Sequence, residues 1–145
     1  MFVQHSVHID QAVEECSAAL ARGSRTWFPR LQADNGAEVG LRVAGVSIHK
    51  RVIVELGEPQ MKGEWTNVPI TWKATFPEQL FPVLAGRLEL VPVDKKTTRL
   101  TVSGMYEPPL GRLGALIDEA IMHSVAEATI REITESIALQ LAAIA

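Results

Sequence analysis

Three side chains of this 145-residue chain combine a polar group with an apolar surrounding, and they could do chemistry in a binding site. Tyr106 and Trp72 each have an apolar ring and a polar tip that needs a partner when it is buried. A phenol that projects into a cavity could donate a hydrogen bond to a ligand carbonyl or act as a weak general acid. The imidazole of His5 alternates with apolar residues and could titrate near neutrality. Plain core packing explains Trp72 and Tyr106 equally well, so the three residues suggest a site without assigning a reaction.

The other reactive residue types form no recognisable constellation. His5 and His8 lie on opposite faces of a regular strand, so they cannot chelate one ion. His123 lies off the apolar stripes of the last helix, and we expect it to be exposed or half-packed. The lone Cys16 has no second cysteine for a disulfide or a cysteine-rich metal site. No nucleophile elbow or phosphate loop stands out. We therefore expect no metal and no cofactor.

Composition predicts one globular domain over residues 1–145. Hydrophobic residues make up 47% of the chain and charged residues 21%, as in ordinary folded proteins. The net charge is −3 and the largest basic cluster is Lys95-Lys96, so nucleic acid is not an expected partner. Apolar runs such as 138–145 are far shorter than the ~20 residues of a membrane span, and the first residues do not resemble a signal peptide. We therefore expect a cytoplasmic protein without integral membrane association.

The sequence pattern predicts a strand, a helix and an irregular segment in the first third of the chain. Residues 2–9 alternate as in a strand with one mostly apolar face. Asp10 stands where an N-cap would, and the apolar spacing predicts a helix from about Gln11 to Arg22, ended by Gly23. Residues 25–30 are expected to form a packed loop or a single helical turn. The turn at 34–36 closes the segment.

Between Glu38 and about Glu107 the hydrophobic period is two, which predicts an antiparallel meander with one covered face and one wet face. The residues that the alternation places on the covered face are Val52, Val54, Leu56, Ile70, Trp72, Ala74, Phe76, Leu88, Leu90, Leu100, Val102, Gly104 and Tyr106.

A long helix is predicted from roughly Arg112 to Ala143, but its apolar stripe changes side near Met122 to Ala128. The first stripe consists of Leu113, Ile117, Ile121 and Ala128. The second consists of Met122, Ala126, Ile130, Ile133, Ile137, Leu141 and Ile144. Either the helix bends, or its first turns are covered on two sides by the 108–109 segment, the Trp27 loop or a second subunit.

This order of elements resembles the START-like, or helix-grip, superfamily, also called SRPBCC. The resemblance covers nearly the whole chain. It is reinforced by Ile9-Asp-Gln-Ala-Val13, by Trp27, by Leu80-Phe-Pro82 and by Tyr106-Glu-Pro-Pro-Leu-Gly111 followed by Asp118, which is similar to an uncharacterised bacterial polyketide cyclase-like branch. It implies an α+β fold in which a curved antiparallel sheet wraps around a long C-terminal helix. A deep cavity is expected between the sheet and this helix. Where some larger members carry a full second helix, this chain has only a short segment between Gly23 and Glu38.

The function that these observations favour is binding of a mostly apolar small molecule, such as a lipid, polyketide, isoprenoid or aromatic metabolite, between the sheet and the last helix. His5 would orient the ligand. The remaining expected lining residues are Trp72, Phe76, Tyr106, Met122, Val125 and Thr129. Two alternatives stay open. The pocket could belong to a cyclase, aromatase or dehydratase in which Tyr106 or His5 moves protons, or the first helical stripe could form the interface of a homodimeric interaction module.

Overall fold

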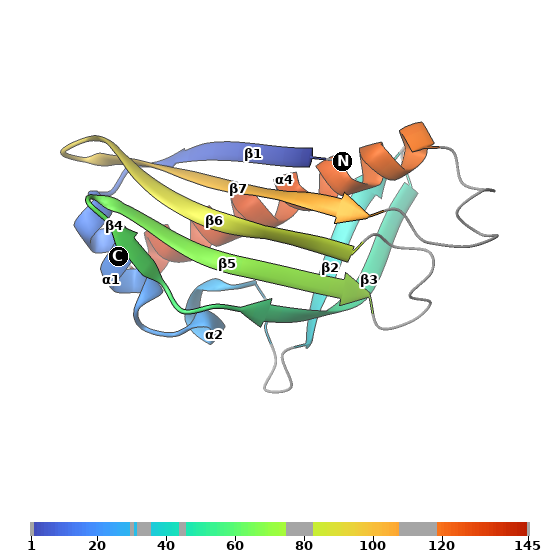
Figure 1. Ribbon diagram of the computed structural model, residues 1–145, viewed down its shortest axis with the longest axis horizontal. Coiled ribbons are helices and arrows are strands. Elements are labelled where there is room, and N and C mark those ends of the chain that lie inside the picture. The colour runs from blue at the N-terminus through green and yellow to red at the C-terminus, as the bar shows by residue number, and fades with distance from the viewer. Residues whose placement is uncertain are drawn as a thin grey trace.

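A curled antiparallel sheet and one long helix make up most of the protein (Figure 1). The computed structural model describes residues 2–29, 31, 36–43, 46–74, 83–107 and 119–144. Its elements in chain order are β1 (Phe2–Ile9), α1 (Val13–Leu20), α2 (Ser24–Trp27), β2 (Gly36–Val43), β3 (Val46–Leu56), β4 (Gln60–Lys62), β5 (Trp65–Ala74), β6 (Val83–Asp94), β7 (Thr97–Glu107) and α4 (Glu119–Ile144).

The sheet confirms the predicted meander. Its strand order is β1-β7-β6-β5-β3-β2, all neighbours are antiparallel, and β4 pairs with β5. Two glycines face each other in the middle of the sheet, because Gly86 of β6 pairs with Gly104 of β7. A Cβ atom on Gly86 would lie only 1.9 Å from the carbonyl oxygen of Ser103. Such a close backbone approach is typical of places where a sheet bends strongly, and only glycine permits it.

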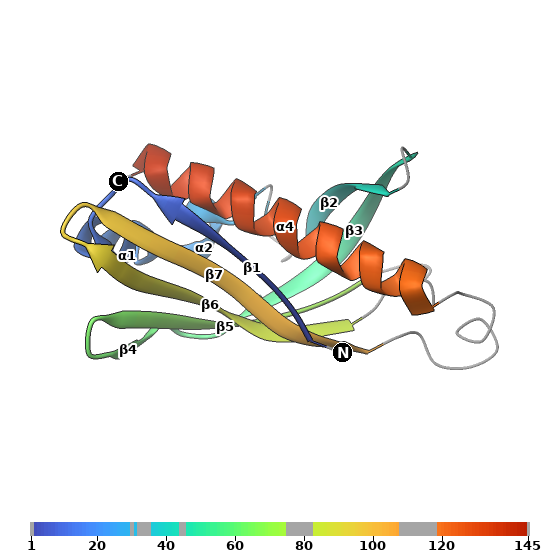
Figure 2. The same cartoon turned by 90° about the horizontal axis from the view of Figure 1, so that it is seen from above.

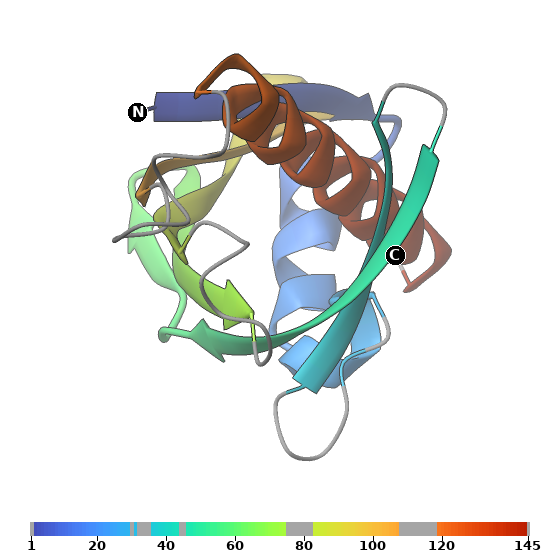
Figure 3. The same ribbon diagram turned by 90° about the vertical axis from the view of Figure 1, so that its right-hand side faces the viewer.

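The long helix α4 crosses the open side of the curled sheet (Figures 2 and 3). Among the described residues, its backbone closely approaches β1 and β7 at one margin of the sheet and β2 at the other. The side chains that it buries are Ala126, Ile130, Ile133, Thr134, Ile137 and Leu141. The second of the two predicted apolar stripes is therefore confirmed as the inward face. Figure 2 shows α4 as one continuous helix. Leu113 and Ile117 of the first stripe lie outside the described residues, so their cover remains a prediction.

The two short helices lie at the end of the sheet where β6 turns into β7 (Figure 1). The sequence predicted either a packed loop or a single helical turn over residues 25–30. The structure has a single helical turn there, α2, which ends at Trp27. The buried indole of Trp27 donates its N–H to the carbonyl oxygen of Leu20 at 3.1 Å, which ties α2 to the end of α1. Gly23 has a φ of 109°, a conformation that favours glycine between two helices.

The predicted start of the first helix was wrong. α1 begins at Val13 rather than Gln11, its N-cap is Ala12 rather than Asp10, and no side chain caps it. The carboxylates of Glu14 and Glu15 lie in the first turn instead, where they meet the positive end of the helix dipole. Neither α1 nor any other helix of the described residues is long and apolar enough to cross a membrane.

Candidate functional site

The candidate site is built on one transverse row of the inner sheet face, which we call the inner row. Backbone pairing aligns four residues from four neighbouring strands, one residue from each. The inner row consists of Val54, Trp72, Leu84 and Tyr106. All four are buried, Trp72 with 4% and Tyr106 with 1% of its surface exposed. The period-two prediction for Trp72 and Tyr106 is therefore confirmed, because both belong to the covered face. Leu84 of β6 lies between them in the inner row.

A hydrogen-bonded chain runs from the inner row to the helix. The Tyr106 hydroxyl lies 2.9 Å from Nδ1 of His123, and Nε2 of His123 lies 2.6 Å from Oε1 of Glu127. The phenol and imidazole rings are tilted by 40° with their centres 5.9 Å apart. The solvent exposure of the side chains rises from Tyr106 to Glu127, because the side chains of His123 and Glu127 are 34% and 52% exposed. These three linked side chains connect a buried phenol with solvent.

Sequence reasoning missed this chain. His123 is half-packed, as expected, but its part in a hydrogen-bonded chain was not foreseen. One signal was present: His123 and Glu127 are four residues apart, a spacing that brings two side chains together on a helix. The partner across space, Tyr106, could not be assigned from spacing, because β7 and α4 meet only through the tertiary fold.

His5 lies on the inner face of β1, as its alternation with Val3 predicted, but away from the inner row. It pairs with Val102, four residues before Tyr106 on β7, which is about 13 Å along a strand. Its Nε2 is shielded from solvent and lies 3.5 Å from Oε1 of Glu135, without hydrogen-bond geometry. The structure therefore places His5 against α4 and does not bring it together with Tyr106.

The other expected lining residues divide into described and undescribed ones. Val125 and Thr129 are half-buried on α4, and the Thr129 hydroxyl donates to the carbonyl oxygen of Val125 at 2.7 Å. That hydroxyl is bonded to its own helix. Met122 belongs to α4, but its side chain is not among those described, and Phe76 lies outside the described residues. Their role in the lining stays a prediction.

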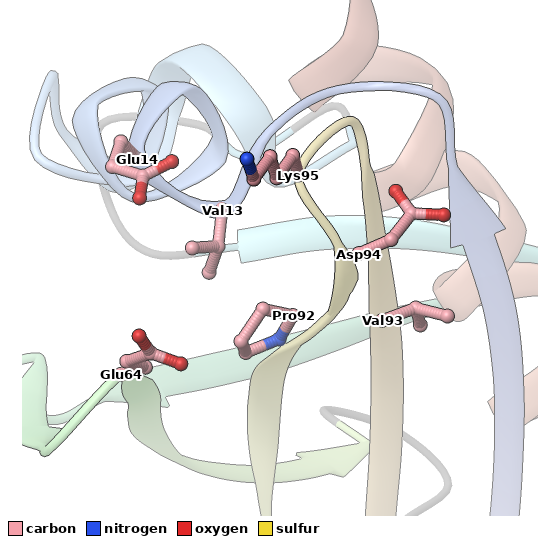
Figure 4. Close-up of a pocket in the computed structure, with 7 residues that line it drawn as sticks. All are labelled: Val13, Glu14, Glu64, Pro92, Val93, Asp94 and Lys95. Carbon is pink, nitrogen blue, oxygen red and sulfur yellow. The ribbon is translucent and has the colours of Figure 1, made fainter.

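A separate polar pocket of about 390 Å³ lies at the opposite end of the sheet (Figure 4). It is lined by Val13, Glu14, Glu64, Pro92, Val93, Asp94 and Lys95. These residues come from the start of α1, from the turn between β4 and β5, and from the end of β6 with the turn that follows it. The described residues contain no group of three or more histidine, cysteine, aspartate or glutamate side chains that could hold a metal ion.

The single cysteine, Cys16, lies on the buried face of α1 and is not a candidate nucleophile. Burial raises the pKa of the Cys16 thiol, a hydrogen bond with Thr98 opposes this effect, and the Glu15 carboxylate adds to it. Because the thiolate is the reactive form, we expect iodoacetamide to label Cys16 slowly in the folded protein and rapidly in denaturant. Mass spectrometry of timed samples measures both rates. Equal rates in the two states would contradict the burial of this thiol.

The curved antiparallel sheet, with α4 held against both of its margins, defines an α+β protein with the helix-grip, or START-like, fold. Solved structures share this fold over nearly the whole chain. A protein from Thermus thermophilus has a TM-score of 0.58 and 12% identity, covering 99% of this chain and 98% of that one. A hypothetical protein from Helicobacter pylori has the same TM-score and identity, covering 99% and 86%.

A third similar structure is the di-domain ARO/CYC protein BexL from the BE-7585A biosynthetic pathway. It has a TM-score of 0.55 and 12% identity, and the alignment covers 99% of this chain and 46% of that one. Comparison with family models and with curated protein sequences gave no match. At these identities the likeness shows the fold, and function must be argued from the residues.

Proposed function

We propose that the protein binds a mostly apolar small molecule between the inner sheet face and α4. The observation that carries this proposal is the way α4 lies across the sheet. Among the described strands, those whose backbones come closest to α4 are β1, β2 and β7, whereas the central strands β5 and β6 lie farther from it. Binding sites for small molecules are concave and mostly apolar, and the inner face of the curled sheet beneath α4 has both properties.

The chemistry of the central strands indicates an apolar ligand. The described inward side chains of β5, β6 and β7 carry no charge, and most of them are aliphatic or aromatic. Burying a ligand phosphate or carboxylate against them would leave that charge without a partner, at a large cost in free energy. The polar tips in the inner row belong to Trp72 and Tyr106, and such tips orient a ligand rather than neutralise it.

A thermal-shift experiment on ligand-free protein tests the proposal. Fatty acids and fused-ring aromatic compounds should stabilise the fold, by about 2.7 kcal/mol at a hundred times the dissociation constant, because they bind only the folded state. Nucleotides and sugar phosphates should leave the melting temperature unchanged. Native mass spectrometry of the protein as purified shows first whether a ligand has been retained.

Tryptophan fluorescence gives an independent measurement. Trp65 is 51% exposed and Trp72 is buried in the inner row, so a Trp65→Phe variant leaves the buried tryptophans to report on the interior. We expect its emission to change when an apolar compound binds. If no apolar compound changes either the emission or the melting temperature of ligand-free protein, binding is refuted.

Turnover is a second candidate function, because the Tyr106 hydroxyl is bonded to an imidazole. A phenol in contact with a base can move a proton, whereas a phenol that only orients a ligand needs no such partner. A cyclase, aromatase or dehydratase that uses this pocket would therefore rely on Tyr106 rather than on His5, which lies at the margin of the sheet. Mass spectrometry of a bound compound before and after incubation separates a carrier, which returns its ligand unchanged, from an enzyme.

A further inference from the structure

One nitrogen atom at the margin of the sheet lacks a hydrogen-bond partner. It is Nε2 of His5, which is shielded from solvent although 29% of the His5 side chain is exposed. Oε1 of Glu135 lies 3.5 Å away on α4, but the geometry is not that of a hydrogen bond. Buried polar atoms in folded proteins nearly always have a partner, so this nitrogen needs a physical explanation.

The protonation state of the imidazole decides what this contact is worth. In neutral His5, Nε2 either carries a poorly aligned hydrogen or turns its lone pair toward the carboxylate oxygen of Glu135. The first arrangement is weak and the second is repulsive. A protonated imidazole has a hydrogen on both nitrogens and a positive charge, so the same position then forms an ion pair with Glu135. The contact between β1 and α4 therefore depends on one proton.

The charged groups around His5 come from α4 alone. The described elements packed against β1 are β7 and α4. On β7, the residue that pairs with His5 is Val102, and the inward residues on either side of it carry no charge. On α4, the charged side chains within one turn of Glu135 are Arg131 and Glu132, and both are exposed. Within the described part of the chain, Glu135 supplies the carboxylate that lies within 4 Å of the imidazole.

We propose that His5 and Glu135 form a proton-operated clasp, which holds α4 to the β1 margin of the sheet in mildly acidic solution and loosens as the pH rises. Histidine is the side chain that gains a proton between about pH 8 and pH 5. A glutamate carboxylate is still ionised at about pH 5.5, so both charges are present together there. The proton comes from water, which reaches the exposed part of the His5 side chain.

The clasp is small but well placed. Glu135 is 54% exposed, so solvent screens the ion pair and limits its effect. Within the described sheet β1 is an edge strand with β7 as its strand neighbour, so α4 provides its second support. Loosening that support should let β1 and α4 separate more often. A ligand beneath α4 should then leave faster at higher pH; this consequence rests on the proposed function, whereas the clasp does not.

Hydrogen exchange of the ligand-free protein at pH 5.5 and pH 8.0 tests the clasp. After correction for intrinsic exchange rates, the backbone amides of β1 should be about threefold better protected at pH 5.5, as a half-exposed ion pair allows. Glu135→Gln keeps the shape of the side chain but removes its charge, so this pH dependence should disappear. His5→Gln removes the group that takes up the proton and should have the same effect.

Two exposed residues provide matched controls. His8 lies on the opposite face of β1, and Glu132 lies three residues before Glu135 on α4, so His8→Gln and Glu132→Gln should keep the pH dependence of the wild type. The clasp is overturned if β1 is equally protected at both pH values in the wild type, or if the pH dependence survives in Glu135→Gln. Glu135 is half exposed, so that variant decides the test even if His5→Gln is unstable. The outcome does not depend on whether apolar compounds bind.

Discussion

Ile137→Ala is expected to lower the free energy of unfolding by about 2–5 kcal/mol, the usual cost of removing a fully buried aliphatic side chain. Ile137 has 0% of its surface exposed and lies in the middle of the inward stripe of α4. The helix crosses the open side of the sheet and is held at the two margins of the sheet. Few neighbouring side chains can therefore move in to fill the space that the smaller side chain leaves. Urea denaturation followed by circular dichroism measures the loss.

Leu139→Ala is the matched control, because Leu139 lies two residues later on the same helix and is 73% exposed. Its replacement should change the stability by no more than about 0.5 kcal/mol. If the two variants lost equal stability, the assignment of the inward face of α4 would be wrong.

Gly86→Ala should cost about 3 kcal/mol, because a new methyl group would lie 1.9 Å from the backbone oxygen of Ser103. Backbone atoms cannot rotate away as the end of a side chain can. The φ angle of Gly86 lies outside the positive range, so the cost is one of space rather than of backbone conformation. Thermal unfolding followed by circular dichroism measures it.

Gly63→Ala provides the control for the conformational effect. Gly63 has a φ of 65° and no atom within 4 Å of its would-be Cβ, so alanine there should cost about 1 kcal/mol through backbone strain alone. A Gly86→Ala variant as stable as Gly63→Ala would show that β6 and β7 can separate at this point. The close approach of the two strands would then not be needed for the curvature.

The fold could be predicted from sequence because its signals are local and periodic. Alternation placed Trp72 and Tyr106 on the covered face, and the second stripe of the last helix gave the buried face of α4. The start of α1 was misplaced because Asp10 is a good capping residue by type, yet β1 continues to Ile9 and the helix begins only at Val13. Helix ends depend on how a chain leaves the preceding strand, which residue type does not reveal.

The site could be predicted only in part. The inward direction of Tyr106 follows from its strand alone, but its partner depends on where α4 lies, and no periodicity contains that information. His123 was set aside because it lies off the apolar stripes, although a residue at the border of a buried face is well placed to join a buried group to solvent. His5 was preferred because an imidazole on an apolar strand is conspicuous, and the structure shows that its position faces the helix at the margin of the sheet.

The pairing of β1 with β7 has a consequence for how the protein folds. Phe2 pairs with Met105, and Ile9 with Thr98, so within the described sheet β1 pairs with a strand that follows it by about a hundred residues. Joining segments so distant in sequence is slow, because chain entropy is lost before any contact is gained. During synthesis β1 must wait, unpaired, until β7 has left the ribosome. Folding should therefore start in the β5–β6–β7 meander, and β1 should be the last strand to gain protection in pulsed hydrogen exchange.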